Sequence, residues 1–86
     1  MMPLPHAVTT DAEVDEMLEA IVRLTQIDLP FLAQVAQIAL QARSMDEREQ
    51  ALVSLYRLGL EQQQPYVADL TDELLCWIEE QRDAAA

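Results

Sequence analysis

The middle of the chain is unusually apolar. The run from Leu29 to Ala42 has no charged residue, although the sequence on either side of it is rich in carboxylates. At about 100° per residue, its apolar side chains cover roughly 220° of a helix, much more than the ~100° stripe of an ordinary surface helix. The remaining strip holds Gln34, Gln37 and Gln41, which are polar but uncharged. The apolar side chains of such a helix need to be buried on more than one side, which predicts extensive contact with other helices or with a partner.

Two capping boxes mark the starts of helices. Thr10 is followed three residues later by Glu13, and Ser44 by Glu47. In this motif the hydroxyl accepts a hydrogen bond from the amide three residues on, and the glutamate reaches back toward the cap. One helix is therefore predicted to start just after Thr10, and another just after Ser44.

Two prolines divide the chain further. Pro30 and Pro65 each suit the first turn of a helix, where a missing amide costs nothing, and each disfavours helical geometry in the residue before it. The first helix is predicted to end near Asp28, and new helices are predicted to begin at both prolines. The resulting fold is all-α: four short helices arranged as two helix–Pro–helix hairpins, forming a bundle that is completed by dimerisation.

Length and composition fit one small helical domain. The 86 residues are 51% hydrophobic and include one glycine, which favours a folded helical chain over a disordered or β-rich one. Residues 1–8 contain two prolines and no periodic pattern, so they are predicted to be a flexible tail. Residues 9–83 form the predicted domain, and residues 84–86 are expected to fray. The two halves align at an offset of 35 residues, with Pro30 on Pro65; hairpin geometry or chance explains this as well as a true repeat does.

The charge of the chain restricts its partners. A formal charge of -11 arises from sixteen acidic residues against five arginines, and there is no lysine. This charge opposes binding to nucleic acid and to anionic membranes, attracts basic proteins, and also keeps an apolar helical protein soluble. Cys76 is the single cysteine, which fits a reducing compartment. No signal peptide is visible, and the charge-free run is too short to span a bilayer, so a cytoplasmic location is expected.

Groups for catalysis and for metal binding are sparse. His6 is the single histidine and lies in the predicted tail, where nothing would orient it as a general base, so the chain is predicted not to be an enzyme. No cofactor is expected either. One face of the last helix carries carboxylates and a thiol that would mix hard and soft ligands, which suits no common metal. A solvated acidic face explains them better; they are Asp69, Asp72, Cys76, Glu80 and Asp83.

The predicted function is protein–protein interaction without catalysis, as an adaptor, a chaperone-like protein or a regulatory subunit. The expected partners are a second copy of the chain and an unidentified protein, with no nucleic acid and no membrane. The aromatic residues Tyr56 and Trp77 could serve as core or as interface anchors, and Gly59 could allow close helix approach or weaken its helix. The candidate interface comprises Phe31, Gln34, Val35, Ile38, Gln41, Leu52, Leu55, Tyr56 and Gly59. The alternative is an acidic inhibitor or nucleic-acid mimic, of the immunity or anti-defence type, that blocks a basic site on its target.

Overall fold

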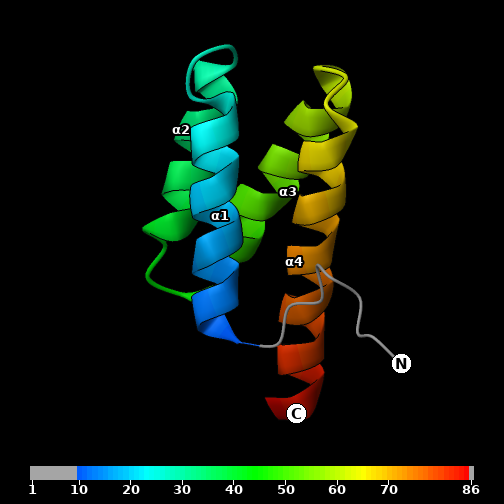
Figure 1. The fold of residues 1–86 in the computed structure, drawn as a ribbon. Coiled ribbons are helices and arrows are strands. Elements are labelled where there is room, and N and C mark those ends of the chain that lie inside the picture. The colour runs from blue at the N-terminus through cyan, green and yellow to red at the C-terminus, as the bar shows by residue number, and fades with distance from the viewer. Residues whose placement is uncertain (1–9, 86) are drawn as a thin grey trace, which may run out of the picture.

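Four helices follow one another in the computed structural model, which describes residues 10–85 (Figure 1). The predicted tail and residue 86 lie outside this range. The helices are α1 (Asp11–Thr25), α2 (Pro30–Leu40), α3 (Met45–Glu61) and α4 (Pro65–Ala85). The described range contains no strand, so the predicted all-α class is confirmed. None of its helices combines the length and the hydropathy needed to cross a membrane.

The capping boxes begin α1 and α3 as predicted. The Thr10 hydroxyl accepts a hydrogen bond from the amide of Glu13 at 3.2 Å, and the Ser44 hydroxyl accepts one from the amide of Glu47 at 3.1 Å. The Glu47 carboxylate in turn accepts a hydrogen bond from the amide of Arg43, one residue before the cap. Both helix starts are therefore fixed by hydrogen bonds within a few residues, independently of the rest of the fold.

The prolines begin the other two helices. α2 starts at Pro30 and α4 at Pro65, as predicted. Between α3 and α4 the chain turns through Gln63, which has a left-handed φ of 57°. The Gln64 amide donates to the Gly59 carbonyl at 2.8 Å, and the Gln63 amide to the Leu60 carbonyl at 3.1 Å. These two hydrogen bonds form a Schellman motif that closes the end of α3, with glutamine where glycine is usual.

The core lies where successive helices pack together. α1 packs on α2, α2 on α3 and α3 on α4, whereas α1 and α4 touch only narrowly. Figure 1 shows α1 and α4 on one side of the molecule and α2 and α3 on the other. The fully buried large side chains of the core are Val14, Leu18, Ile21, Leu32, Leu52, Leu55, Val67, Leu74 and Ile78.

Two threonines are buried in this core without leaving a hydroxyl unpaired. The Thr25 hydroxyl donates to the Ile21 carbonyl, and the Thr71 hydroxyl donates to the Val67 carbonyl, each at 2.6 Å. A hydroxyl that bonds back to its own helix satisfies its polar group locally, so it can be buried at little cost.

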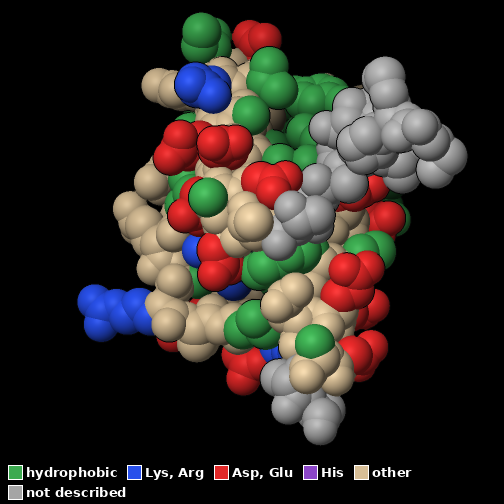
Figure 2. Space-filling model, turned by 60° about the horizontal axis from the view of Figure 1, so that its bottom comes forward, with side chains coloured by type: hydrophobic (Ala, Val, Ile, Leu, Met, Phe, Trp, Pro, Cys, Tyr) green, Lys and Arg blue, Asp and Glu red, His purple; other side chains and the backbone are tan. Residues whose placement is uncertain are grey.

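Two arginines on the surface tie α3 and its neighbours together. Arg48 of α3 pairs with Asp15 of α1 at 3.3 Å. Arg82 of α4 pairs with Glu49 at 2.8 Å and also with Asp46, both on α3. Elsewhere on the face seen in Figure 2, acidic side chains outnumber the basic ones, as the formal charge of -11 requires.

Candidate protein–protein interface

The wide apolar arc of α2 is divided between core and surface. Leu32, Ala36 and Ala39 are buried inside the chain. On the adjacent side, the side chain of Phe31 is 64% exposed and that of Ile38 is 60% exposed. Isolated exposed apolar residues are common, but these two are large and lie on a helix without a charged residue.

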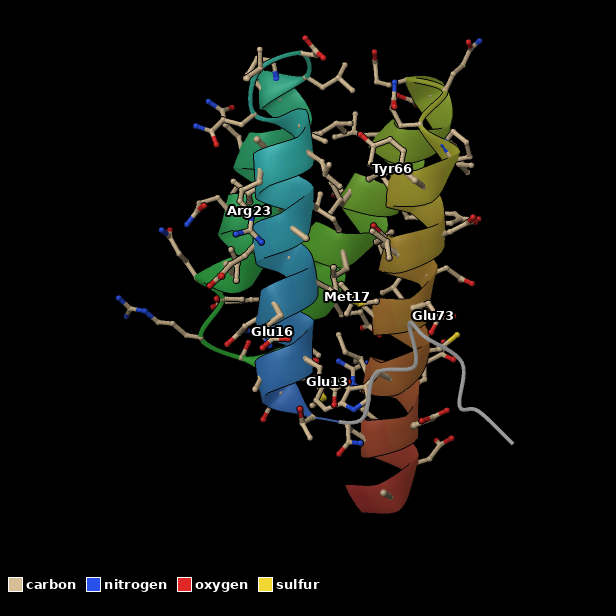
Figure 3. All side chains as sticks on the ribbon, in the orientation of Figure 1. Glu13, Glu16, Met17, Arg23, Tyr66 and Glu73 are labelled. Carbon is tan, nitrogen blue, oxygen red and sulfur yellow. The ribbon has the colours of Figure 1, made fainter. Side chains whose placement is uncertain are left out.

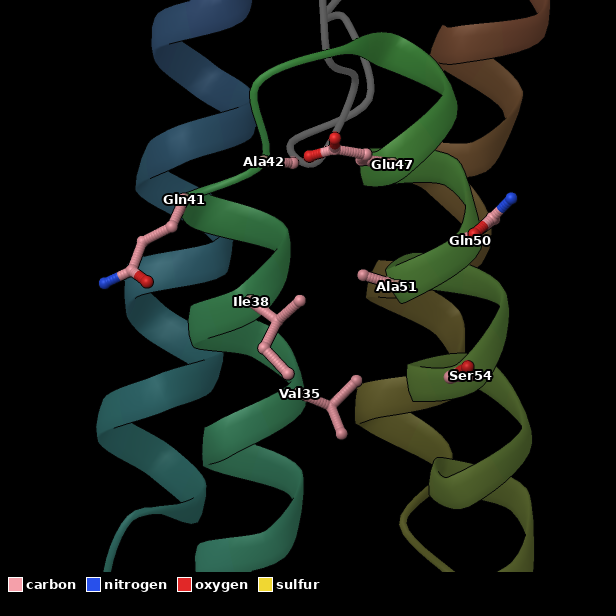
Figure 4. Close-up of a pocket in the computed structure, with 8 residues that line it drawn as sticks. All are labelled: Val35, Ile38, Gln41, Ala42, Glu47, Gln50, Ala51 and Ser54. Carbon is pink, nitrogen blue, oxygen red and sulfur yellow. The ribbon is translucent and has the colours of Figure 1, made fainter.

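A shallow groove of about 520 Å³ separates α2 from α3 on this side (Figure 4). Val35 and Ile38 of α2 point toward α3 and form its apolar wall. Its one carboxylate, that of Glu47, already accepts the Arg43 amide hydrogen bond. The full lining, named here the α2–α3 groove, is Val35, Ile38, Gln41, Ala42, Glu47, Gln50, Ala51 and Ser54.

The structure separates the candidate interface residues into two groups. Those of α2 lie at or near the surface: Phe31, Gln34, Ile38 and Gln41 are exposed, and Val35 is half-buried, as is Tyr56 of α3. The others are inside the single chain: Leu52, Leu55 and Gly59. The side chains of Leu52 and Leu55 are 0% exposed because α3 packs against α2 on one side and α4 on the other. These three residues therefore hold the chain together and leave the surface of α2 as the candidate interface.

Gly59 is the point of close approach between α3 and α4. A Cβ atom at this position would lie 3.1 Å from the Ala68 backbone nitrogen and 3.3 Å from a Val67 methyl carbon. Of the two roles considered for this glycine, the close approach of helices is the one that its surroundings support.

Trp77 belongs to the core. Its side chain is 7% exposed and packs with the buried residues of the other helices. Its indole Nε1 is buried without a hydrogen-bond acceptor among the described residues. The ring also borders a small cavity of about 270 Å³ beside the Arg48–Asp15 ion pair.

The acidic face of α4 carries an exposed free thiol, Cys76. Loss of hydration raises the pKa of this thiol, and repulsion from nearby carboxylates, chiefly those of Asp72 and Glu79, raises it further. Among residues 10–85, no three side chains of metal-binding type lie close enough together to hold an ion. His6 lies outside the described residues.

Cys76 is therefore expected to react slowly with iodoacetamide. A raised pKa leaves less thiolate at pH 8 than in an unstructured cysteine peptide, and thiolate is the reactive form. The rate should approach that of the peptide as the pH rises above both pKa values. Replacing Asp72 with asparagine should speed the reaction at pH 8, because one repelling charge is lost. Mass spectrometry of timed samples measures both rates, and equal rates for protein and peptide at pH 8 would contradict this account.

A second groove, which the sequence analysis missed, lies between α1 and α4. It has a volume of about 530 Å³ and is named here the α1–α4 groove. Leu24 follows the buried Ile21 by three residues, a spacing that favours burial, but 59% of its side chain is exposed. The Leu24 side chain is exposed because α1 and α4 touch only narrowly, so α4 does not cover it. The lining residues are Leu24, Tyr66, Asp69, Leu70, Asp72 and Glu73.

Comparison with protein-family models, with curated proteins and with solved structures finds no match to this chain.

Proposed function

We propose that this protein is a small acidic interaction module without catalytic activity, and that it forms a homodimer through α2. The observation that carries the proposal is the exposure of Ile38 in the α2–α3 groove and of Phe31 at the start of the same helix, which has no charged residue. Burying such side chains in a second copy would remove apolar surface from water, which is the main driving force of association.

The charge of the chain favours contact between two copies through α2 over contact through its other surfaces. Two chains of formal charge -11 repel each other, and the repulsion is strongest where carboxylates face one another. α2 presents Gln34, Gln37 and Gln41 to solvent in place of carboxylates. Two copies related by a twofold axis can bring this surface together without opposing charges of like sign across it. In this proposal, the hairpins α1–α2 and α3–α4 of each chain pair to complete a larger bundle.

The test is the molar mass of the wild type and of the Ile38→Glu variant. The wild type is expected to have twice the 9.7 kDa mass of one chain at micromolar concentration. Ile38→Glu should return the mass of one chain while keeping its helix content, because 60% of the Ile38 side chain is already in solvent. A buried, unpaired charge at the proposed interface would oppose the dimer. Light scattering after size exclusion, with circular dichroism, measures both properties.

Ile27→Glu is the matched control. Ile27 is 88% exposed between α1 and α2 and does not line the α2–α3 groove, so the same substitution there should leave the dimer intact. A wild type with the mass of one chain at high concentration would refute the proposal. Equal dissociation of both variants would also refute it, because a general effect of charge would then explain the result.

A second candidate function is that of an acidic inhibitor that occupies a basic site on a target. The carboxylates of Asp69, Asp72 and Glu73 around the α1–α4 groove favour it. The two candidates respond differently to salt. Association through α2 should tolerate salt because it is apolar, whereas binding to a basic site should weaken steeply between low and moderate ionic strength. In both cases the free thiol of Cys76 fits a reducing, cytoplasmic location.

A further inference from the structure

The α1–α4 groove is separate from the proposed dimer interface. The two grooves lie on opposite sides of the molecule, since α1 and α4 are in front in Figure 1 and behind α2 and α3 in Figure 4. Its floor is apolar: 59% of the Leu24 side chain and 38% of the Tyr66 side chain are exposed, and Leu70 is half-buried. Figure 3 shows Tyr66 of α4 and Met17 of α1 in the space between the two helices.

One rim of this groove is acidic. Asp69, Asp72 and Glu73 line it from α4, and no arginine is part of the lining. The sequence contains no lysine or arginine between Arg57 and Arg82, so α4 carries no cation before its last turn. Among the described residues, no ion pair involves Asp69 or Asp72.

Two arginines serve other contacts, and a third lies outside the groove lining. Arg48 and Arg82 pair with carboxylates of α1 and α3. Arg23 precedes Leu24 on α1 but does not belong to the groove lining. The groove therefore combines an apolar floor with two rim carboxylates, those of Asp69 and Asp72, that form no ion pair within the described residues.

We propose that the α1–α4 groove binds a basic amphipathic helix of a partner protein. Apolar side chains of that helix would cover Leu24, Tyr66 and Leu70, and its lysines or arginines would face the carboxylates of α4. Helix-in-groove recognition uses this combination of apolar anchors and flanking charge. The inference rests on the proposed role as an interaction module and names the chemistry of the partner.

Other occupants fit this surface less well. A second copy of the chain would bring more negative charge to an acidic rim, since α1, α3 and α4 all carry several carboxylates. An added β-strand would need an exposed sheet edge, which the described helical fold does not offer. A basic amphipathic helix has cations that complement the acidic rim and an apolar stripe that can cover the apolar floor.

The probe is a fluorescently labelled synthetic peptide of about 18 residues, or five helical turns, with leucines at helical spacing and lysines elsewhere. A matched peptide has glutamate in place of every lysine. The wild type is expected to bind the lysine peptide and not the glutamate peptide, as measured by fluorescence anisotropy at physiological salt. Absence of binding to the lysine peptide, or equal binding to both, would overturn the inference.

Matched double variants separate the groove from the overall charge. Asp69→Asn with Asp72→Asn removes two rim charges and should weaken binding roughly ten-fold, given the usual strength of partly exposed ion pairs. Asp28→Asn with Glu61→Gln removes the same charge from exposed positions outside the groove and should change affinity less than about two-fold. Equal losses in the two double variants would show that binding is nonspecific attraction.

The apolar floor is tested with Leu24→Ser, whose exposed position should let the variant fold. This variant should bind the lysine peptide several-fold more weakly, with helix content unchanged. An unchanged affinity would show that the apolar floor takes no part in binding, and would refute the inference. Ile38→Glu distinguishes the two proposals, since a monomer should still bind the lysine peptide. A wild type that dimerises without binding the peptide would overturn this inference alone, and a monomeric wild type that binds it would overturn the dimer alone.

Discussion

Truncation of Leu52 to alanine is expected to lower the free energy of unfolding by about 2–5 kcal/mol, the usual range for a leucine removed from a packed core. The Leu52 side chain is 0% exposed and belongs to the core shared by all four helices. A domain of this size has little stability to spare, so the melting temperature should fall by about 10 °C or more. Thermal and urea unfolding, followed by circular dichroism, measure the change.

Leu60→Ala is the control for this prediction. It makes the same substitution in the same helix, but 53% of the Leu60 side chain is exposed, so the loss should stay below about 1 kcal/mol. The comparison is best made in the Ile38→Glu background, where the proposed dimer is absent. Equal losses at the two positions, or a loss at Leu52 that appears in the dimer alone, would show that Leu52 serves the interface and not the core.

The helix starts could be predicted because their causes are local, whereas α1 ends at Thr25, three residues before the predicted Asp28. Thr10 and Ser44 cap helices through hydrogen bonds that span three residues, and Pro30 and Pro65 act through their own rings. Nothing distant in the chain needs to be known for either effect. The all-helical class followed from the same signals and from the helical spacing of the apolar residues.

The division between core and interface could not be predicted, because it depends on how helices are placed. The arc of α3 is as wide as that of α2, but α3 packs against helices on two sides and α2 leaves Phe31 and Ile38 uncovered. Periodicity identifies an apolar face without saying which helix covers it. For this reason the sequence pattern places Leu52 and Leu55 in the candidate interface, although both are buried within one chain.

The α1–α4 groove could not be predicted for the same reason, since it too depends on how helices are placed. Leu24 continues the stripe of Val14 and Leu18, and its spacing alone predicts burial. Its exposure reflects the narrow contact between α1 and α4, which no pattern within either helix encodes. Asp69 and Glu73 share one helix face with Tyr66 on α4, and this spacing is a local signal of carboxylates beside an apolar side chain.

Gly59→Leu is expected to be the most disruptive change at the contact of α3 with α4. The first added carbon would already lie 3.1 Å from the Ala68 backbone nitrogen, and a backbone atom cannot turn aside as a flexible side chain can. The remaining carbons would have to force the helices apart, and overpacking of this kind costs about 1–3 kcal/mol or more. A fall in melting temperature of about 10 °C is expected in thermal unfolding.

Gly59→Ala separates the effect of contact from that of helix propensity. Alanine adds the close carbon alone and also gains about 1 kcal/mol of helix propensity over glycine, so the two effects should largely offset each other. Its melting temperature should stay within a few degrees of the wild type, far above that of Gly59→Leu. If leucine were tolerated as well as alanine, α3 and α4 could not approach as closely as the structure has them. Gly59 would then remain a candidate residue of the interface between chains.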